Sequence, residues 1–332
     1  MKLRKTLLLI SAGVIGVVLC IGASLALGAR NVGLGEVFRA LFQDSSNSFD
    51  ALVVWERIPR TVFGIVAGAS LGVAGALMQA ITRNPVADPS ILGVNTGASL
   101  FVVSGIAFFN VNTAGEYIWF ALAGAMVTAV FVYRIGSLGY GGATPIKLAL
   151  AGAATSAALS SLVSAVILPR TDVMNVFRFW QVGSVSGATW EGIMTVAPFL
   201  AAGLLMGILM APALNALALG DDAATGLGVR TGLVRSTGAV AGVLLCGATT
   251  ALAGPIGFVG LMIPHTVRLI CGPDMRYILP MSALGGAMLL TVSDIVGRLI
   301  GQPGELEAGI VTAFFGAPIL IMIAMRAKVR SL

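Results

Sequence analysis

Long apolar runs separated by short polar segments dominate the chain. Ten of them approach the ~20 residues that an α-helix needs to cross ~30 Å of hydrocarbon. They lie at 7–28, 61–81, 91–109, 118–133, 148–168, 192–213, 236–254, 257–271, 278–297 and 308–325, and the eighth is the shortest. The pattern predicts an all-α, polytopic membrane protein with about ten transmembrane helices, folded as a single domain over residues 1–332.

The second run carries small residues on one helical face. Gly64, Gly68, Gly72, Ala76 and Ala80 follow one another at intervals of four. Small side chains let a neighbouring backbone approach closely within a membrane. We therefore expect this helix to be packed against protein on that face.

Composition supports the membrane class, and charge predicts the orientation. Charged residues make up 10% of the chain and apolar residues 57%, which is too little charge to cover a soluble protein of 332 residues. With ten spans both termini lie on one side, and that side holds thirteen of the 20 Lys and Arg residues. The positive-inside rule then places both termini in the cytoplasm, so the formal charge of +6 is mainly an insertion signal.

The first apolar run has two interpretations. Basic residues precede it and small residues end it, as in a cleaved signal peptide. However, it is longer than the 7–15 residues of a usual signal core, which favours a retained first helix in the plasma membrane.

Several kinds of chemistry have no support in the sequence. The three cysteines show no paired spacing and His265 is the only histidine, so neither a disulfide framework nor a zinc site is expected. No P-loop motif is present, so the chain is not expected to hydrolyse ATP in that manner. We expect a non-enzymatic chain with no metal and no cofactor of its own.

The longest cytoplasmic loop, about 214–235, has the features of a docking surface. Asp221 or Asp222 is expected to cap a short helix, and Gly226 and Gly228 permit a sharp turn after it. A merely solvated connector would need neither the two turn glycines nor the small apolar residues Ala223, Ala224 and Leu227. We therefore expect a soluble partner to bind here.

Three arginines are predicted at helix mouths on the outer face: Arg57, Arg60 and Arg298. Guanidinium groups are suited to bidentate capture of carboxylates, although ordinary interfacial anchoring is the alternative. Asp294 lies inside the ninth run, four residues before Arg298. A local ion pair explains it better than proton coupling does.

A stripe of hydroxyl groups follows the fifth run at intervals of four: Ser156, Ser160 and Ser164. These hydroxyls can bond back to the carbonyl four residues earlier. They can equally line a water-accessible path, and the residues alone leave both interpretations open.

Five ordered motifs together resemble the FecCD-type permease family, the membrane subunits of ABC importers for ferric siderophores, haem and vitamin B12. They are Arg57-Ile-Pro-Arg60, the segment from Gln79 to Val94, Leu219-Gly-Asp-Asp-Ala, Gly254-Pro-Ile-Gly-Phe-Val-Gly-Leu-Met-Ile-Pro264-His265, and Gly309-Ile-Val-Thr-Ala-Phe-Phe-Gly-Ala-Pro318. The resemblance covers essentially the whole chain. It implies a type II ABC importer fold, a second permease subunit, two cytoplasmic ATPase subunits that bind ATP and Mg²⁺, and an extracytoplasmic binding protein.

The resemblance also implies site residues. The outer arginines match positions that receive acidic residues of the binding protein, and spans 5 and 10 line the path, which favours the serine stripe as part of it. The ATPase coupling residues would be Leu219, Gly220, Asp221, Asp222, Ala223, Ala224, Gly226, Leu227 and Gly228, and the cytoplasmic gate would be Asn84, Pro85, Thr144, Pro145 and Ile146.

One segment departs from the family pattern. The family usually has Glu-Leu-Pro-Val/Ile-Gly before the last span, whereas this chain has Glu305-Leu-Glu307-Ala-Gly309. The sequence thus predicts an importer permease for an iron chelate, with a ferric siderophore as the first expectation and haem or cobalamin as others. An ion- or proton-coupled secondary carrier is the alternative, although the spans offer it little beyond Asp294.

Overall fold

The computed structural model describes residues 2–43, 48–111, 113–139 and 144–326, and every regular element in these ranges is helical. The helices are α1 (Lys2–Ala26), α2 (Leu34–Phe42), α3 (Phe49–Thr82), η1 (Pro89–Leu92), α4 (Val94–Phe109), α5 (Ala114–Gly136), α6 (Pro145–Ile167), α7 (Thr171–Val182), α8 (Trp190–Leu217), α9 (Asp221–Gly226), α10 (Thr231–Ala253), α11 (Val259–Cys271), α12 (Met275–Ile300) and α13 (Ala308–Arg326). The predicted all-α class is confirmed.

Seven helices within the described ranges are long and apolar enough to cross a membrane: α1, α3, α5, α6, α8, α10 and α12. The other three expected spans coincide with the shorter apolar helices α4, α11 and α13. Each expected span therefore falls wholly or mostly on one helix, while the count of ten membrane crossings stays a prediction.

Helix α3 is the centre of the bundle. It packs against α12, α10, α11 and α8, and 78% of the residues in its most apolar stretch are buried. Its small-residue face meets α12, where the backbone of Gly286 lies against Gly68 and that of Ser282 against Gly72, too close for a side chain on either glycine. The prediction of close packing on this face is confirmed, because only hydrogen fits between the two helices.

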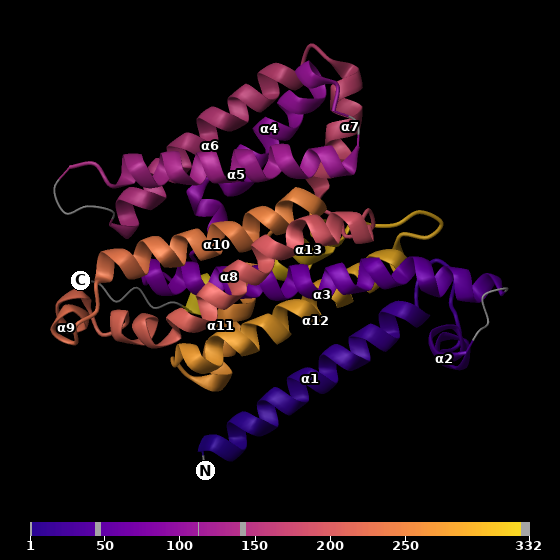
Figure 1. Ribbon diagram of the computed structural model, residues 1–332, viewed down its shortest axis with the longest axis horizontal. Helices are drawn as coiled ribbons and strands as arrows, with labels where there is room; N and C mark the ends of the chain where they lie inside the picture. The colour runs from indigo at the N-terminus through magenta and orange to yellow at the C-terminus, as the bar shows by residue number, and fades with distance from the viewer. Residues whose placement is uncertain (1, 44–47, 112, 140–143, 327–332) are drawn as a thin grey trace.

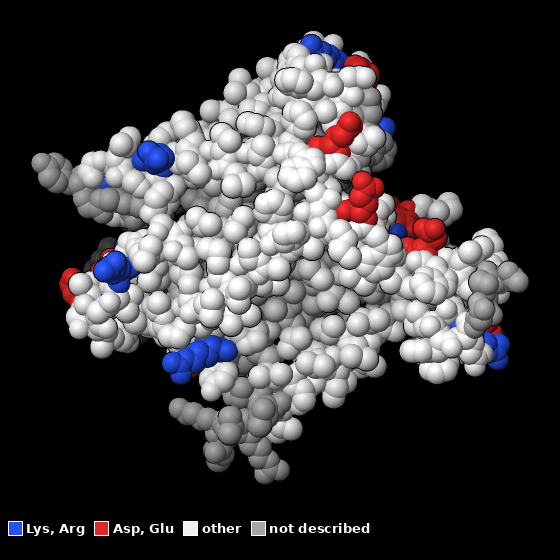
Figure 2. Space-filling model, viewed as in Figure 1, with Lys and Arg blue, Asp and Glu red and all other residues white. Residues whose placement is uncertain are grey.

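The bundle has two ends, which Figure 1 shows on opposite sides. At one end lie α2, the first turns of α3 and the loop between α12 and α13; we call it the α2 end. At the other lie α9, the last turn of α3 and the first turns of α6 and α10; we call it the α9 end. Between them, the face shown in Figure 2 is almost free of charge, with basic side chains toward both ends and most of the acidic ones toward the α2 end.

The helices differ from the prediction in three main respects. Helix α3 begins at Phe49 instead of at 61, and it continues through Pro59. The third run is interrupted at Gly93, whose φ of +72° separates η1 from α4. Helices α2 and α7 were not predicted, because they are short and only partly apolar.

Candidate functional site

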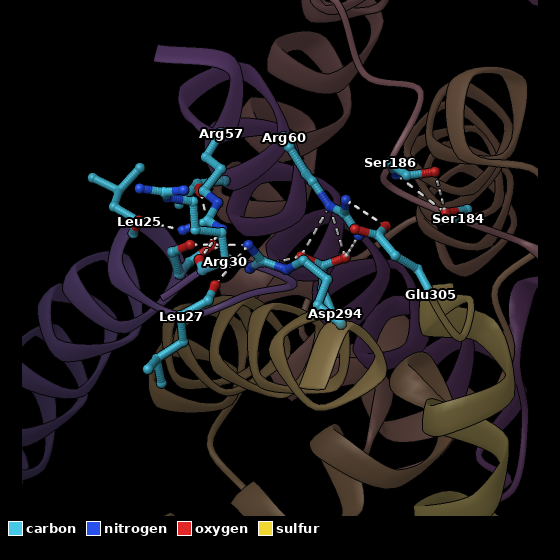
Figure 3. A network of polar contacts seen from close by, with 12 residues as sticks. Leu25, Leu27, Arg30, Arg57, Arg60, Ser184, Ser186, Asp294 and Glu305 are labelled. Atoms are coloured by element: carbon cyan, nitrogen blue, oxygen red, sulfur yellow. Dashed lines mark hydrogen bonds and ion pairs between the residues drawn. The ribbon is translucent and has the colours of Figure 1, made fainter. Parts of the chain in front are cut away.

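At the α2 end, two arginines bind one buried aspartate. Arg60 of α3 places Nη2 2.7 Å from Oδ1 of Asp294, and Arg298 places Nη2 3.0 Å from Oδ2 of the same carboxylate. The side chain of Asp294 is 4% exposed and that of Arg298 2%. Arg60 also binds Glu305 of the following loop, with Nη1 2.7 Å from Oε2 (Figure 3). The cluster thus joins α3, α12 and the loop after α12.

Arg298 of this cluster and the nearby Arg57 bind backbone carbonyls at the end of α1. Arg298 donates from Nη1 to the carbonyl oxygens of Ser24 and Leu27, each at 3.0 Å. Arg57 donates to the carbonyl oxygens of Leu25 at 2.8 Å and Arg30 at 2.6 Å (Figure 3). These carbonyls belong to the last turn of α1 and the segment after it, where intrahelical partners are lacking. The guanidinium groups therefore serve as a C-terminal cap for α1.

A cavity of about 450 Å³ opens beside this cluster. Its lining includes Arg57, Arg60 and Arg298 together with Glu56 and Glu305. With Asp294, the three positive charges are balanced by three negative ones. Apolar side chains such as Phe49 and Leu52 line the rest of the cavity. The cavity with its cluster has no formal net charge, so it is not a strongly basic patch.

This geometry changes the interpretation of the three arginines. The prediction that they stand at helix mouths is wrong for Arg57 and Arg60, because α3 begins about two turns before Arg57. All three arginines line the cavity, but Arg57 and Arg298 are buried. Arg57 donates to backbone carbonyls, and Arg298 donates to backbone carbonyls, to Ser24 and to Asp294. Arg60 is the arginine that Glu305 binds at the cavity. Docking of a binding protein on these residues stays a prediction, and it would require Arg60 to exchange Glu305 for another carboxylate.

The predicted ion pair between Asp294 and Arg298 is confirmed. Sequence reasoning missed its second partner, Arg60, which lies 234 positions away along the chain. Both carboxylate oxygens of Asp294 accept hydrogen bonds from guanidinium groups, so the negative charge of Asp294 is balanced by neighbouring positive charges. This arrangement disfavours a proton-carrying role.

At the α9 end, two other arginines share another aspartate. Asp221 Oδ1 accepts from Arg83, which ends α3, and from Arg235 of α10 at 2.9 Å. Arg83 also donates to the carbonyl oxygen of Leu217, the last residue of α8, at 2.7 Å. We call Asp221, Arg83 and Arg235 the α9 clamp, because they connect α9 to the central helix.

The predicted short helix in the 214–235 loop is confirmed as α9, followed by a turn at Gly228 with φ +83°. The capping role predicted for Asp221 or Asp222 is wrong, since Gly220 occupies the N-cap and neither carboxylate makes a cap bond. Both aspartates lie in the first turn, where their charge suits the helix dipole.

The outer surface of α9 is open. Leu219 is 68% exposed and Leu227 65%, and Asp222, Ala223, Gly226 and Gly228 are also exposed, whereas Ala224 is buried. Exposed leucines beside acidic residues at the end of a bundle form a surface suited to a soluble partner. Binding of an ATPase subunit here stays a prediction.

The gate residues implied by the resemblance also lie at the α9 end. Asn84 and Pro85 are in the exposed turn after α3, where Asn84 Oδ1 accepts from the backbone N–H of Val86 at 3.1 Å. Thr144 caps α6 by accepting from Lys147, Pro145 is the first residue of that helix, and Ile146 is exposed. The contacts explain how the two turns are shaped, and the gating role stays a prediction.

The serine stripe lies on a helix that one chain leaves largely uncovered. Only 11% of the residues in the apolar stretch of α6 are buried, Ser156 is half-buried, and Ser160 and Ser164 are exposed. Ser164 donates to the carbonyl oxygen of Ser160 at 3.0 Å, which is the back-bonding considered from the sequence. Pathway lining stays a prediction.

Half-buried Asp88 follows the turn at Asn84. Its Oδ1 accepts from the backbone N–H of Ser90 at 2.9 Å and caps η1. Burial raises the pKa of this carboxyl above its ordinary value, and the bonds to Ser90 oppose that rise. Asp88 forms no ion pair with any residue in the described ranges.

A family model described as the FecCD transport family matches residues 16–326. The chain belongs to the FecCD transport family. Among its relatives, the ferric enterobactin transport system permease protein FepD of Escherichia coli is 44% identical over 305 residues, which cover 91% of this chain and 90% of FepD. A probable siderophore transport system permease protein of Bacillus subtilis, YfiZ, is 40% identical over 92% of this chain and 91% of its own length. The hemin transport system permease protein HmuU of Yersinia pestis is 32% identical over 95% of this chain and 96% of its own.

The fold of this FecCD member also matches solved structures. A transporter described as metal-chelate type ABC, in an inward-facing conformation, superposes with a TM-score of 0.83 at 24% identity and covers 97% of this chain and 99% of its own. PsaBC from Streptococcus pneumoniae superposes with a TM-score of 0.62 at 14% identity, over 87% of this chain and 95% of its own. At these identities the likeness establishes the fold alone.

Proposed function

We propose that this FecCD member is the permease subunit of an ATP-binding-cassette importer that translocates an iron chelate, with a ferric siderophore as the first substrate to test. FepD and YfiZ, both at least 40% identical to this chain, are named for siderophore transport, and HmuU, at 32%, is named for hemin. An extracytoplasmic binding protein would deliver the chelate at the α2 end. Both termini would lie in the cytoplasm, as the distribution of Lys and Arg predicts.

The proposed mechanism rests on the ion pairs of the α9 clamp. A partner that moves α9 also pulls on Arg83, and hence on the last turn of the buried helix α3. The chain performs no bond chemistry in this mechanism. ATP and Mg²⁺ would be bound by a separate ATPase, whose states favour different conformations of the bundle.

A second permease subunit would cover α6 and α13. Large apolar side chains on α13 are exposed, including Phe314, and α6 is the least buried of the long apolar helices. Either a homodimer or a heterodimer with a related permease would bury this apolar surface. Ser156, Ser160 and Ser164 would then face the interface between the two subunits, where the path would run.

Cellular uptake tests the substrate. Labelled ferric siderophores, haem and cobalamin are offered to a strain with and without this chain, and to the deletion strain complemented with it. We expect uptake of one iron-chelate class to be lost in the deletion strain and restored in the complemented strain. Loss of cobalamin uptake alone would contradict the iron assignment, and ATP-independent uptake that Asp294→Asn abolishes would favour the secondary carrier.

Co-purification tests the α9 surface. Replacing residues 221–228 with a Gly/Ser linker should prevent the ATPase subunit from co-purifying. The double variant Leu219→Ser, Leu227→Ser should weaken the association while retaining the helix. Leu269→Ser, an equally exposed leucine at the end of α11, is the matched control. Intact assembly in the linker variant would contradict the coupling assignment.

A further inference from the structure

A shallow apolar groove of about 170 Å³ lies between α5 and α10. Each helix contributes residues at five positions with the same helical spacing: 126, 129, 130, 133 and 134 on α5, and 236, 239, 240, 243 and 244 on α10. Residues at such intervals share one face of a helix. Two helical faces therefore form the walls, and buried Leu92 of η1 lies on the inner side.

The groove opens onto the uncharged flank of the bundle. Met126, Val130 and Val240 line it and are each about half exposed. In a bilayer this flank contacts lipid, and an uncovered apolar groove is filled by acyl chains. Each wall extends over nine residues, so its first and last residues are about 12 Å apart at 1.5 Å per step, which is close to the ~15 Å hydrocarbon depth of one leaflet.

The polar groups of the groove gather at one of its ends. Because α5 runs toward the α9 end and α10 runs away from it, Tyr133 and Arg134 in the last turns of α5 meet Ser236 near the start of α10. Arg134 is exposed, and its guanidinium makes no hydrogen bond or ion pair with any residue that the structure describes. Ser236 Oγ donates its hydrogen to the carbonyl oxygen of Leu233 at 3.0 Å, so the group that can bind an anion here is Arg134. An available guanidinium is suited to a phosphate.

The neighbouring charges increase this preference for an anion. A second, much smaller pocket shares Leu92, Tyr133 and Ala239 with the groove, and its lining includes Arg235 of the α9 clamp. There Arg83 and Arg235 share the single carboxylate of Asp221, which leaves one positive charge uncompensated within the clamp.

We propose that the groove between α5 and α10 binds one anionic glycerophospholipid, with an acyl chain along its apolar walls and the phosphate at Arg134. The cavity is smaller than the 300–1,000 Å³ of ordinary ligand pockets, so it fits a chain segment better than a compact chelate. The charge distribution places the α9 end on the cytoplasmic side, where anionic lipids bind basic pockets between helices. The lipid would lie beside the clamp, and its binding is independent of the transported substrate.

Native mass spectrometry of the purified full-length chain tests the proposal. The chain is incubated in detergent with dioleoyl phosphatidylglycerol or dioleoyl phosphatidylcholine at equal ratios, and the retained phospholipid is counted. We expect about fivefold greater retention of phosphatidylglycerol, the preference that one basic residue near the headgroups provides. Arg134→Gln should abolish the preference, whereas Arg276→Gln, an exposed arginine in the first turn of α12, should leave it unchanged.

Two further arms test the apolar part of the site. Val240→Trp, at a half-exposed position that tolerates a larger side chain, should reduce retention of both lipids. Glycerol phosphate, which has the charge without the acyl chains, should not displace phosphatidylglycerol. Equal retention of the two lipids by the unmodified chain, identical behaviour of Arg134→Gln and Arg276→Gln, unchanged retention in Val240→Trp, or displacement by glycerol phosphate would each overturn the proposal.

Discussion

Toward each end of the bundle, α3 is held by an aspartate that binds two arginines, but one of these clusters is buried and the other is exposed. At the α2 end, Arg60 of α3 shares Asp294 with Arg298; at the α9 end, Arg83, the C-cap residue of α3, shares Asp221 with Arg235. The side chain of Asp294 is 4% exposed, whereas that of Asp221 is 44% exposed.

The difference in exposure assigns the two clusters different roles. A buried ion cluster cannot lose one member without leaving a charge uncompensated, so it fixes helix positions. An exposed cluster contributes little to stability and can rearrange at low cost. We infer that the α2 end is the fixed end of α3 and that the α9 end is the one that can move.

The largest expected effect is that of Asp294→Asn, which breaks the buried cluster. It leaves Arg298 buried without its counter-charge, so the free energy of unfolding should fall by about 3–5 kcal/mol. Thermal unfolding of the purified chain in detergent measures this loss. Asp172→Asn, an exposed carboxylate on α7, is the control and should have little effect. An unchanged unfolding midpoint in Asp294→Asn would remove the distinction between the two ends.

A much smaller loss is expected for Asp221→Asn. The exposed ion pairs of the α9 clamp should contribute at most about 1 kcal/mol to the free energy of unfolding. The same thermal measurement applies, with the adjacent and more exposed Asp222→Asn as the matched control. A loss as large as that of Asp294→Asn would show that the exposed cluster is also a structural anchor.

The α2 end can be examined further through Glu305, the most exposed partner of Arg60. Glu305→Gln should release Arg60 for a carboxylate of the binding protein and lower the dissociation constant of docking up to about fivefold, the equivalent of ~1 kcal/mol. Surface plasmon resonance with the assembled transporter measures this. Unchanged or weaker docking would mean that Arg60 is structural only.

Asp88 offers a carboxylate near the α9 end that has no arginine partner among the described residues. Burial raises the pKa of Asp88 in the folded chain above its value in the unfolded chain. Protonated Asp88 therefore stabilises the fold at pH values below the unfolded pKa, and this contribution is lost as pH rises through the folded pKa. Asp88→Asn retains the cap on Ser90 without the ionisation. Its unfolding midpoint should therefore exceed that of the unmodified chain at pH 7, with the gap narrowing toward pH 4. A constant gap across this range would contradict the assignment.

The helices could be predicted from the sequence because apolar length and small-residue spacing are local. The face of Gly68 and Gly72 predicted the close approach of α3 to another helix, and the spacing of Asp294 and Arg298 predicted their ion pair. The long-range partners could not be predicted. Arg60 and Asp294 are 234 positions apart and Arg83 and Asp221 are 138, and no local pattern indicates such pairs.

The arginines at the α2 end illustrate the same limit. The sequence shows guanidinium groups on the side that the positive-inside rule disfavours, which suggested docking. Whether a guanidinium is available depends on whether carbonyl groups such as those of Ser24 and Leu27 surround it. That is a property of packing between α1, α3 and α12.

The ratio of substrate uptake to ATP hydrolysis in Asp221→Asn tests the central claim most directly, that the α9 clamp transmits ATPase movement to α3. The assembled transporter is reconstituted in vesicles with its binding protein, its ATPase and the chelate identified by cellular uptake, and Asp172→Asn is the control. We predict that Asp221→Asn retains the ATPase subunit and its hydrolysis while uptake per ATP falls about fivefold, the equivalent of ~1 kcal/mol of lost coupling. Uptake per ATP equal to that of Asp172→Asn and the unmodified chain would contradict the claim.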